Sequence, residues 1–422
     1  MNLLKTTLEN GLTVVLRETH SAPVTSVWIW YRVGSRNEHL GITGISHWVE
    51  HMLFKGTARW PRQKLDQAIA REGGYLNGMT WYDFTTYFET LPSAKAYLAL
   101  DIEADRMTNA LFDADEVAAE RTVVISERQG NENDPTFLLD EELTGAAFRV
   151  HPYGHDTIGH LCDLQTLTRD DLYAHYRTYY APNNAILAAA GDFNAGEMLR
   201  MIERAFDKIP PREPLPHVTA QEPPQRGERR VIVEGNAGTD YLALAFHTPQ
   251  ATHPDLHALT VLSTVLAGGA SSLVGSGSLT NYTSRLYRAV VARDLAAEVN
   301  ASLIPTVDPG LYRISATVLP DHTPAEVEDA LRAELELLRR EPITAEELAK
   351  AKRQARALFA FSSESITNQA FWLGFSEIFA DTSWFLHYLE RLEAVTAEDV
   401  LRVADTYLRP QNMTVGHYLT QD

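Results

Sequence analysis

Hydrophobic and polar residues follow two different patterns along this chain. Short runs rich in apolar, aromatic and β-branched residues are typical of strands, and longer runs in which apolar residues recur every three or four positions are typical of amphipathic helices. The strand-like runs predict strands at residues 12–17, 24–33, 82–90, 230–234, 241–246 and 310–318. The helical runs are residues 42–54, 92–107, 115–130, 324–340 and 344–362. Hairpin-like strands beside separate long helices indicate an α+β fold with antiparallel-rich sheets.

The α+β pattern occurs twice, because the two halves of the chain resemble each other. At a constant displacement of 228 positions (396 − 168 = 228), Thr168, Asp171, Tyr179, Pro182 and Asn184 recur as Thr396, Asp399, Tyr407, Pro410 and Asn412. In each copy the threonine precedes a predicted helix, whose first turn its hydroxyl can cap. We therefore expect two homologous α+β domains, at residues 1–212 and 229–422, joined by a proline-rich linker at residues 213–228.

The composition narrows the class of protein. Hydrophobic residues make up 45% and charged residues 22% of the chain, which is the balance of a globular protein. The formal net charge of -19 argues against a nucleic-acid partner, because phosphate binding needs clustered positive charge. No run of about 18 apolar residues is present, so we expect no membrane span. The single cysteine, Cys162, and a start without a signal-peptide core favour a cytoplasmic location, or a periplasmic one if a leader has been removed.

The segment with the most specific chemistry holds His47, Glu50 and His51. On the helix predicted at residues 42–54, the two histidines are four positions apart and project from the same face, so both imidazoles can reach one metal ion. Zinc in catalytic sites takes imidazole and carboxylate ligands and keeps one position for water, whose proton a nearby carboxylate can accept. The order His-x-x-Glu-His is the inverzincin motif. We therefore expect one Zn²⁺ ion, with Glu50 as the general base.

Two histidines leave room for a third protein ligand. The helix predicted at residues 115–130 offers Glu116, Glu120 and Glu127. Glu120 and Glu127 lie two helical turns apart and share a face, so one could bind the metal while the other orients a ligating histidine. Spacing alone leaves the choice between them open, and any helical glutamate can instead face solvent.

At this point the sequence resembles a known family, the M16 (pitrilysin/insulinase) zinc metallopeptidases, and within it the bacterial relatives of the zinc-bearing subunit of the mitochondrial processing peptidase. The family motif is followed by a glutamate ligand 76 residues on, and that count from His51 reaches Glu127. A supporting glutamate stands seven residues earlier, at Glu120. Further matches are residues 8–12, 51–57 and 151–154. The resemblance implies a two-domain clam-shell in which His47, His51 and Glu127 bind zinc.

The same resemblance implies how a substrate would bind. In this family a peptide lies as an added strand against an exposed sheet edge, so that main-chain hydrogen bonds give affinity without strict sequence preference. The matching segment contains Asn77, Gly78, Met79 and Thr80, and Asn77 corresponds to a substrate-contacting position. The plain alternative for this segment is an ordinary hairpin arm.

The second half departs from the family pattern. Family peptidases usually carry an Arg and a Tyr seven residues apart that hold the substrate, and here these positions are Val290 and Ala297. We therefore expect a heterodimer in which a related chain supplies the Arg/Tyr pair, with a homodimer as the alternative. A glycine-rich stretch at residues 268–278 is expected to form a mobile loop facing the cleft between the halves, with a simple surface linker as the alternative. A scaffold subunit, or a module that captures peptides without cutting them, is the competing interpretation.

Overall fold

The computed structural model describes residues 3–212, 215–268 and 282–421, and the chain forms two compact units. Unit 1 comprises residues 1–129, 155–219 and 363–385. Unit 2 comprises residues 130–154, 220–362 and 386–422. The first half of the sequence thus contributes residues 130–154 to unit 2, and the second half contributes residues 363–385 to unit 1. The domain boundaries expected from sequence, at residues 212 and 229, do not include this exchange. The glycine-rich stretch lies, from residue 269 onward, outside the described residues.

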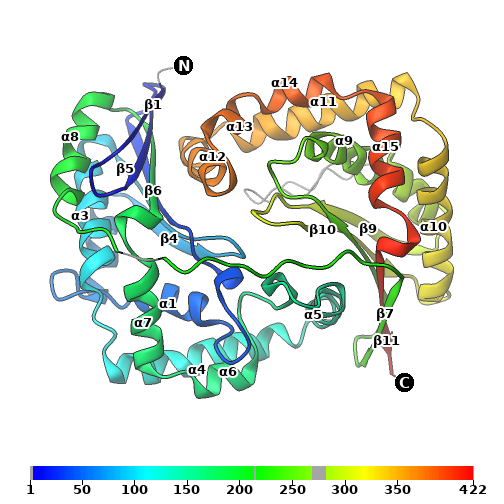
Figure 1. Ribbon diagram of the computed structural model, residues 1–422, viewed down its shortest axis with the longest axis horizontal. Coiled ribbons are helices and arrows are strands. Elements are labelled where there is room, and N and C mark those ends of the chain that lie inside the picture. Colours follow the sequence, from blue (N-terminus) through cyan, green and yellow to red (C-terminus); the bar gives the residue numbers. More distant parts are fainter. Residues whose placement is uncertain (1–2, 213–214, 269–281, 422) are drawn as a thin grey trace. The chain divides into compact units, whose positions relative to one another are not determined.

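Unit 1 is built on a six-stranded sheet that has β1 at one edge and β4 at the other (Figure 1). The strands, in spatial order, are β1 (Leu3–Thr7), β2 (Thr13–Glu18), β6 (Ala185–Gly191), β3 (Val24–Tyr31), β5 (Thr85–Pro92) and β4 (Tyr75–Thr80). All neighbours are antiparallel except β2 and β6, which run parallel. Strand β4 pairs only with β5 among the described residues, so its other edge is free of any strand.

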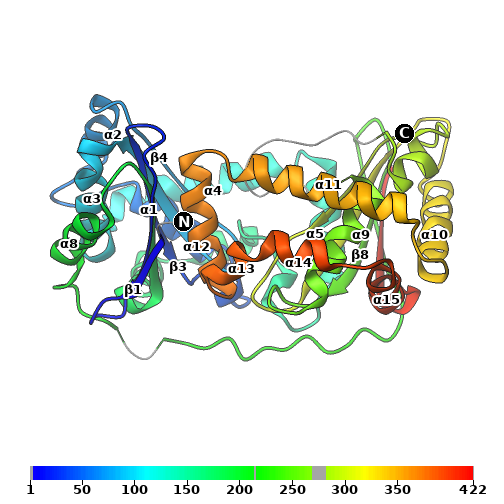
Figure 2. The ribbon, with the colours of Figure 1, turned by 90° about the horizontal axis from the view of Figure 1, so that it is seen from above.

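Helices cover both faces of the unit 1 sheet. The helices from the first half are α1 (Ile45–Leu53), α2 (Arg62–Arg71), α3 (Ala96–Asn109), α4 (Ala114–Asn131), α6 (Leu161–Thr166), α7 (Arg169–Tyr179) and α8 (Ala195–Phe206). The main hydrophobic core lies under them and includes Val27, Ile29 and Tyr31 of β3. Alternate residues of β3 point to the other face, where Trp28 and Trp30 contact Phe371. That aromatic ring belongs to α12 (Ile366–Phe379), which lies along β3 in Figure 2 and is followed by α13 (Thr382–Leu386).

Unit 2 repeats this plan with a five-stranded sheet. The strands, in spatial order, are β7 (Arg229–Gly235), β11 (Met413–Thr420), β8 (Tyr241–Thr248), β10 (Gly310–Val318) and β9 (Ala296–Leu303). The helices from the second half are α9 (Asp255–Ala267), α10 (Pro324–Arg340), α11 (Ala345–Ser362), α14 (Tyr388–Ala394) and α15 (Ala397–Tyr407). Helix α5 (Pro135–Ala147), from the first half, packs on β7, β11 and β8. It is the counterpart of α12 in unit 1.

The recurring residues found in the sequence perform the same local tasks in both units. Thr168 caps α7 and Thr396 caps α15, each in a reciprocal bond pattern with the aspartate three positions on. After each helix an asparagine side chain donates to the carbonyl of the repeated tyrosine, from Asn184 at 2.9 Å and from Asn412 at 2.8 Å. These bonds fix the turn between helix and strand, which explains why the residues recur. The predicted duplication of an α+β unit is confirmed.

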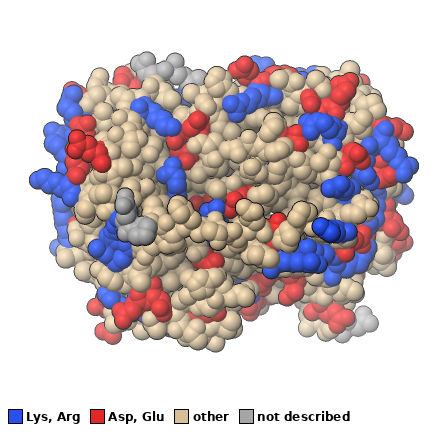
Figure 3. Space-filling view, viewed as in Figure 1, with Lys and Arg blue, Asp and Glu red and all other residues tan. Residues whose placement is uncertain are grey.

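Most predicted elements are present, with shifts at their ends. Strand β10 and helix α10 have the predicted limits. Strand β5 extends to Pro92, so the helix expected from residue 92 begins later, at Ala96. Among the described residues no helix is both long and apolar enough to cross a bilayer. Basic and acidic side chains are intermixed on the face drawn in Figure 3.

Candidate metal centre

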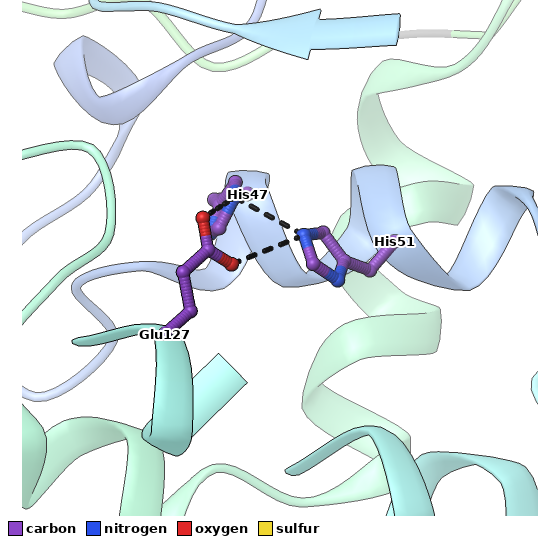
Figure 4. Close-up of side chains that lie close together, drawn as sticks. All are labelled: His47, His51 and Glu127. Atoms are coloured by element: carbon purple, nitrogen blue, oxygen red, sulfur yellow. Dashed lines mark hydrogen bonds and ion pairs between the residues drawn. The ribbon is translucent and has the colours of Figure 1, made fainter. Parts of the chain in front are cut away.

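The two motif histidines project together from α1. Gly44 precedes this helix with a φ of 83°, a left-handed conformation that glycine adopts without strain, and the helix starts at Ile45. The opposite side of α1 is anchored by buried apolar residues, including Trp48 and Val49. The Nε2 atoms of His47 and His51 lie 3.2 Å apart (Figure 4). The predicted pairing of two imidazoles on one helical face is therefore present.

Glu127 on α4 completes a three-residue cluster. One carboxylate oxygen lies 3.6 Å from Nε2 of His51 and the other lies 3.9 Å from Nε2 of His47, as Figure 4 shows. With one ligand atom taken from each residue, the three atoms all lie within 4.8 Å of one another. The side chain of Glu127 is 44% exposed, so solvent reaches the cluster from this side. Of the two glutamates between which spacing left the choice open, Glu127 belongs to the cluster and Glu120 does not, and Glu116 also lies outside it.

The cluster has the donor set and the size of a zinc site. Zinc bonds to nitrogen and oxygen are about 2.0–2.2 Å long, so donors at two tetrahedral positions lie about 3.3–3.6 Å apart. The nitrogen pair and one nitrogen–oxygen pair agree with this spacing to about 0.1 Å, and the pair between His47 and Glu127 is 0.3 Å longer. Burial, together with the neighbouring His51, lowers the pKa of His47 to about 3 and keeps it neutral, the form that binds metal. The residues therefore fit a zinc ion.

Glu120 lies behind His51, on the side away from the cluster. Its Oε1 accepts a hydrogen bond from Nδ1 of His51 at 2.9 Å, and its Oε2 forms an ion pair with Lys55. The bond keeps a proton on Nδ1 and leaves the lone pair of Nε2 directed at the cluster. Burial lowers the pKa of His51, but the bond to Glu120 and the charges of nearby carboxylates outweigh it and raise this pKa overall. Lys55 was not predicted, and it lies beyond the end of α1 and of the helix expected at residues 42–54.

Glu50 is buried next to the cluster and is held by the edge strand. Its Oε2 accepts a hydrogen bond from Oγ1 of Thr80 on β4, at 2.9 Å. Burial raises the pKa of Glu50 to about 6, although the Thr80 bond acts in the opposite direction. A carboxyl group with such a pKa can accept and release a proton near neutral pH. The sequence placed Thr80 among substrate-contacting residues and gave no sign of its bond to Glu50.

The segment predicted to bind peptide forms β4, the edge strand of the sheet. Asn77 is exposed, and its side chain accepts a hydrogen bond from the backbone of Gly78. A Cβ atom at Gly78 would lie 3.0 Å from the rings of Phe54 and Tyr87, so a side chain here would push these rings away and glycine favours the close approach of this strand to the end of α1. Met79 is half-buried beside them. An extended chain could pair with the free edge of β4.

The two positions where the second half departs from the family pattern lie in unit 2. Val290 is fully buried in a short π-helical segment, Tyr287–Val291. Ala297 is exposed on β9. Neither side chain can donate a hydrogen bond. No described part of unit 2 forms a second cluster of metal-binding residues of this kind.

The fold and the cluster define a class of protein, a duplicated α+β chain that carries the inverzincin motif on one helix and a distant glutamate on another. Residues 13–160 match the family model "Insulinase (Peptidase family M16)", and residues 166–355 match "Peptidase M16 inactive domain". An uncharacterized zinc protease of Mycobacterium bovis is 30% identical over 95% of this chain and 89% of its own length. The chain belongs to the M16 family, a family of zinc proteases.

Two further relatives support this assignment. A probable mitochondrial-processing peptidase subunit beta of Arabidopsis thaliana is 28% identical over 97% of this chain and 77% of its own length. The crystal structure of a protease from Helicobacter pylori matches with a TM-score of 0.93 and 28% identity, over 99% of both chains. The family resemblance and the fold class predicted from sequence are thereby confirmed.

Proposed function

We propose that this chain is a zinc-dependent endopeptidase subunit that hydrolyses peptides. The observation that carries the proposal is the convergence of His47, His51 and Glu127 beside the buried carboxyl group of Glu50. A bound zinc ion supplies a Lewis acid that polarises the scissile carbonyl and acidifies a water molecule. In this proposal one Zn²⁺ ion is held per chain by the three clustered residues.

The protein side chains have separate tasks in the reaction. Glu50 takes the proton of the attacking water and later returns it to the leaving amine, which its raised pKa favours. Thr80 keeps the Glu50 carboxylate in place through its 2.9 Å hydrogen bond. Glu120 orients the ring of His51. The substrate would lie as an extended strand along Asn77, Gly78 and Met79, because β4 has a free edge and its last residue is bonded to the proposed base.

We further propose that a related M16 subunit completes the enzyme as a heterodimer. Val290 and Ala297 provide no hydrogen-bond donor from their side chains, so a substrate-holding Arg/Tyr pair would come from the second chain. The relative named as a probable mitochondrial-processing peptidase subunit beta gives a precedent for a similar chain acting as a subunit. A homodimer that works without the pair is the alternative. A subunit that only binds peptides or supports an assembly is the non-catalytic alternative.

The test is cleavage of a quenched fluorescent peptide by the purified, zinc-loaded chain, with and without a chelator. Glu50→Gln should lower kcat by about 10²–10⁴-fold, the usual contribution of a general base, while zinc remains bound. Glu116→Gln, on α4 but outside the cluster, is the matched control and should keep full activity.

The outcomes separate the alternatives. Chelator-sensitive turnover by the chain alone would support the peptidase and argue against an obligatory partner. Zinc binding without turnover, followed by turnover when a second M16 subunit is added, would support the heterodimer. Equal handling of peptides by wild type and Glu50→Gln, with that subunit present, would show that peptide hydrolysis is not the function.

A further inference from the structure

The short helix α6 contacts the segment that leads into α1. Asp163 of α6 accepts hydrogen bonds from the backbone N–H groups of Gly41 and Thr43, each at 3.0 Å, and from the Thr43 hydroxyl at 2.6 Å. Three hydrogen bonds to one buried carboxylate fix the turn that immediately precedes Gly44 and the start of α1. The position of the two histidines on α1 is thereby tied to α6.

Arg121 of α4 forms hydrogen bonds with the C-terminal end of α6. Its Nη1 donates to the carbonyl oxygens of Leu164 and Gln165, both at 2.8 Å, and its Nη2 donates to that of Leu167 at 2.6 Å. The last carbonyls of a helix have no partner inside the helix, and a cation is favoured there. The planar guanidinium fork can serve several such carbonyls at once, which an ammonium group cannot do in the same geometry.

The same guanidinium also touches α1 directly. Its central carbon lies 4.9 Å from the centre of the Trp48 ring. Trp48 is fully buried and is the residue after His47. A cation above an indole face is attracted by the ring, more strongly where water is excluded. Arg121 therefore links α4 to α1 in two ways, by stacking on Trp48 and through α6.

Packing alone holds α4 weakly. Val117 and Val124 are the buried apolar side chains of this helix, Ile125 is partly buried against the same core, and Val123 is 49% exposed. Yet α4 carries both Glu120, the residue before Arg121, and Glu127. A helix with so thin an apolar face can slide or rotate unless polar contacts fix it.

We propose that Arg121 is a positioning residue of the metal centre, which sets the place of Glu127 and Glu120 relative to the histidines of α1. Metal sites tolerate errors of only about 0.2 Å in donor position. Loss of the Arg121 contacts would let α4 shift, so Glu127 would leave its ligand position and His51 would lose its orienting partner. The inference rests on the proposed metal site but not on catalysis.

The experiment measures zinc affinity of the full chain by competition with a chromophoric chelator. Arg121→Met should raise the zinc dissociation constant by about 10–100-fold, the usual cost of losing a group that orients ligands. The zinc dissociation constant of Arg121→Lys should lie between those of Arg121→Met and wild type, because lysine keeps the positive charge over Trp48 but lacks the planar guanidinium group. The matched control is Arg229→Met, since Arg229 donates to carbonyls at the end of α5, Ala146 at 2.8 Å and Ala147, far in sequence from any metal ligand. Its zinc affinity should equal that of wild type.

A coupling measurement separates positioning from loss of stability. In a Glu127→Gln background the ligand that Arg121 places is already impaired, so adding Arg121→Met should weaken zinc binding less than it does in wild type. The absorption spectrum of the Co²⁺-loaded protein should also change in Arg121→Met and not in Arg229→Met. Wild-type zinc affinity in a folded Arg121→Met or Arg121→Lys chain, or full additivity with Glu127→Gln, would overturn the inference. Failure of wild type itself to bind zinc would overturn the proposed metal site and this inference with it.

Discussion

Acidification is expected to destabilise unit 1 through His175 of α7. This side chain is only 7% exposed, and its Nε2 lies 3.2 Å from the hydroxyl oxygen of Ser46, the residue before His47 on α1. The Ser46 hydroxyl can donate to the carbonyl of Gly34, at 3.1 Å, so it accepts from a neutral His175. Burial lowers the pKa of His175 to about 4, although the charge of Glu38 acts in the opposite direction. A charged imidazole is therefore disfavoured in the folded chain.

The sign and size of the effect follow from proton linkage. Above the ordinary histidine pKa of about 6.5, His175 is neutral in both states and does not affect stability. As the pH falls from there toward 4, His175 is protonated in the unfolded chain but stays neutral in the folded chain, so the unfolded state is favoured. The free energy of unfolding falls by about 2 kcal/mol between neutral pH and pH 5, and by about 3 kcal/mol when the pH is well below 4.

Tryptophan fluorescence provides a selective assay, because the tryptophans of the chain all fall in unit 1. They are Trp28, Trp30, Trp48, Trp60, Trp81, Trp372 and Trp384. Urea unfolding would be followed at pH 7 and pH 5 in the presence of a chelator, so that protonation of metal-bound histidines does not contribute. Replacement of His175 by Gln should remove about 2 kcal/mol of the pH dependence. If wild type and the variant lose the same free energy of unfolding between the two pH values, the reasoning is refuted.

Two substitutions test the packing of unit 1 in the same unfolding assay. Arg106→Met should cost about 3–5 kcal/mol, because Arg106 is 1% exposed, its Nη1 lies 3.0 Å from Glu103, and its removal leaves that carboxylate buried without a counter-charge. Adding Glu103→Gln should restore part of this loss, and a single-variant cost below about 1 kcal/mol would contradict the argument. Gly374→Ala on α12 should destabilise by about 1–3 kcal/mol, since a Cβ atom there would meet Trp30 at 2.0 Å. Gly196→Ala on α8, a helical position of unit 1 where a Cβ atom would meet nothing closer than 3.4 Å, should be neutral or stabilising, and equal effects at both glycines would argue against the close contact.

The part of the site that sequence predicts best depends on local geometry. His47 and His51 must share a face whenever residues 45–53 are helical, so their pairing follows from spacing alone. The capping threonines of α7 and α15 were predictable for the same reason, because a cap involves residues three positions apart. The choice of Glu127 over Glu120 as ligand needed the family resemblance. Their roles depend on how α4 lies against α1, and that is set by Arg121 contacts that no local pattern reveals.

The part that sequence could not predict depends on long-range packing. Thr80 is 30 positions from Glu50, and its bond to that carboxylate arises only when β4 takes the sheet edge. Helices α5 and α12 were absent from the predicted elements. The apolar residues of a buried helix do not say which sheet it will cover. Composition and periodicity therefore give no sign that α12 belongs to unit 1 and α5 to unit 2.

The exchange of these two helices gives a physical reason for the second unit, although the proposed metal site of the described residues lies in unit 1. Trp28 and Trp30 form a large aromatic surface on the sheet of unit 1, and the ring of Phe371 covers it at 5.4 and 5.1 Å between ring centres. Exposing such rings would be costly, since each aromatic side chain buries roughly 150–250 Å². Among the described residues, the helix that covers this face is α12, from the second half of the sequence. Burial of the sheet that supports the metal centre thus requires the second half, whether or not that half ever contacts a substrate.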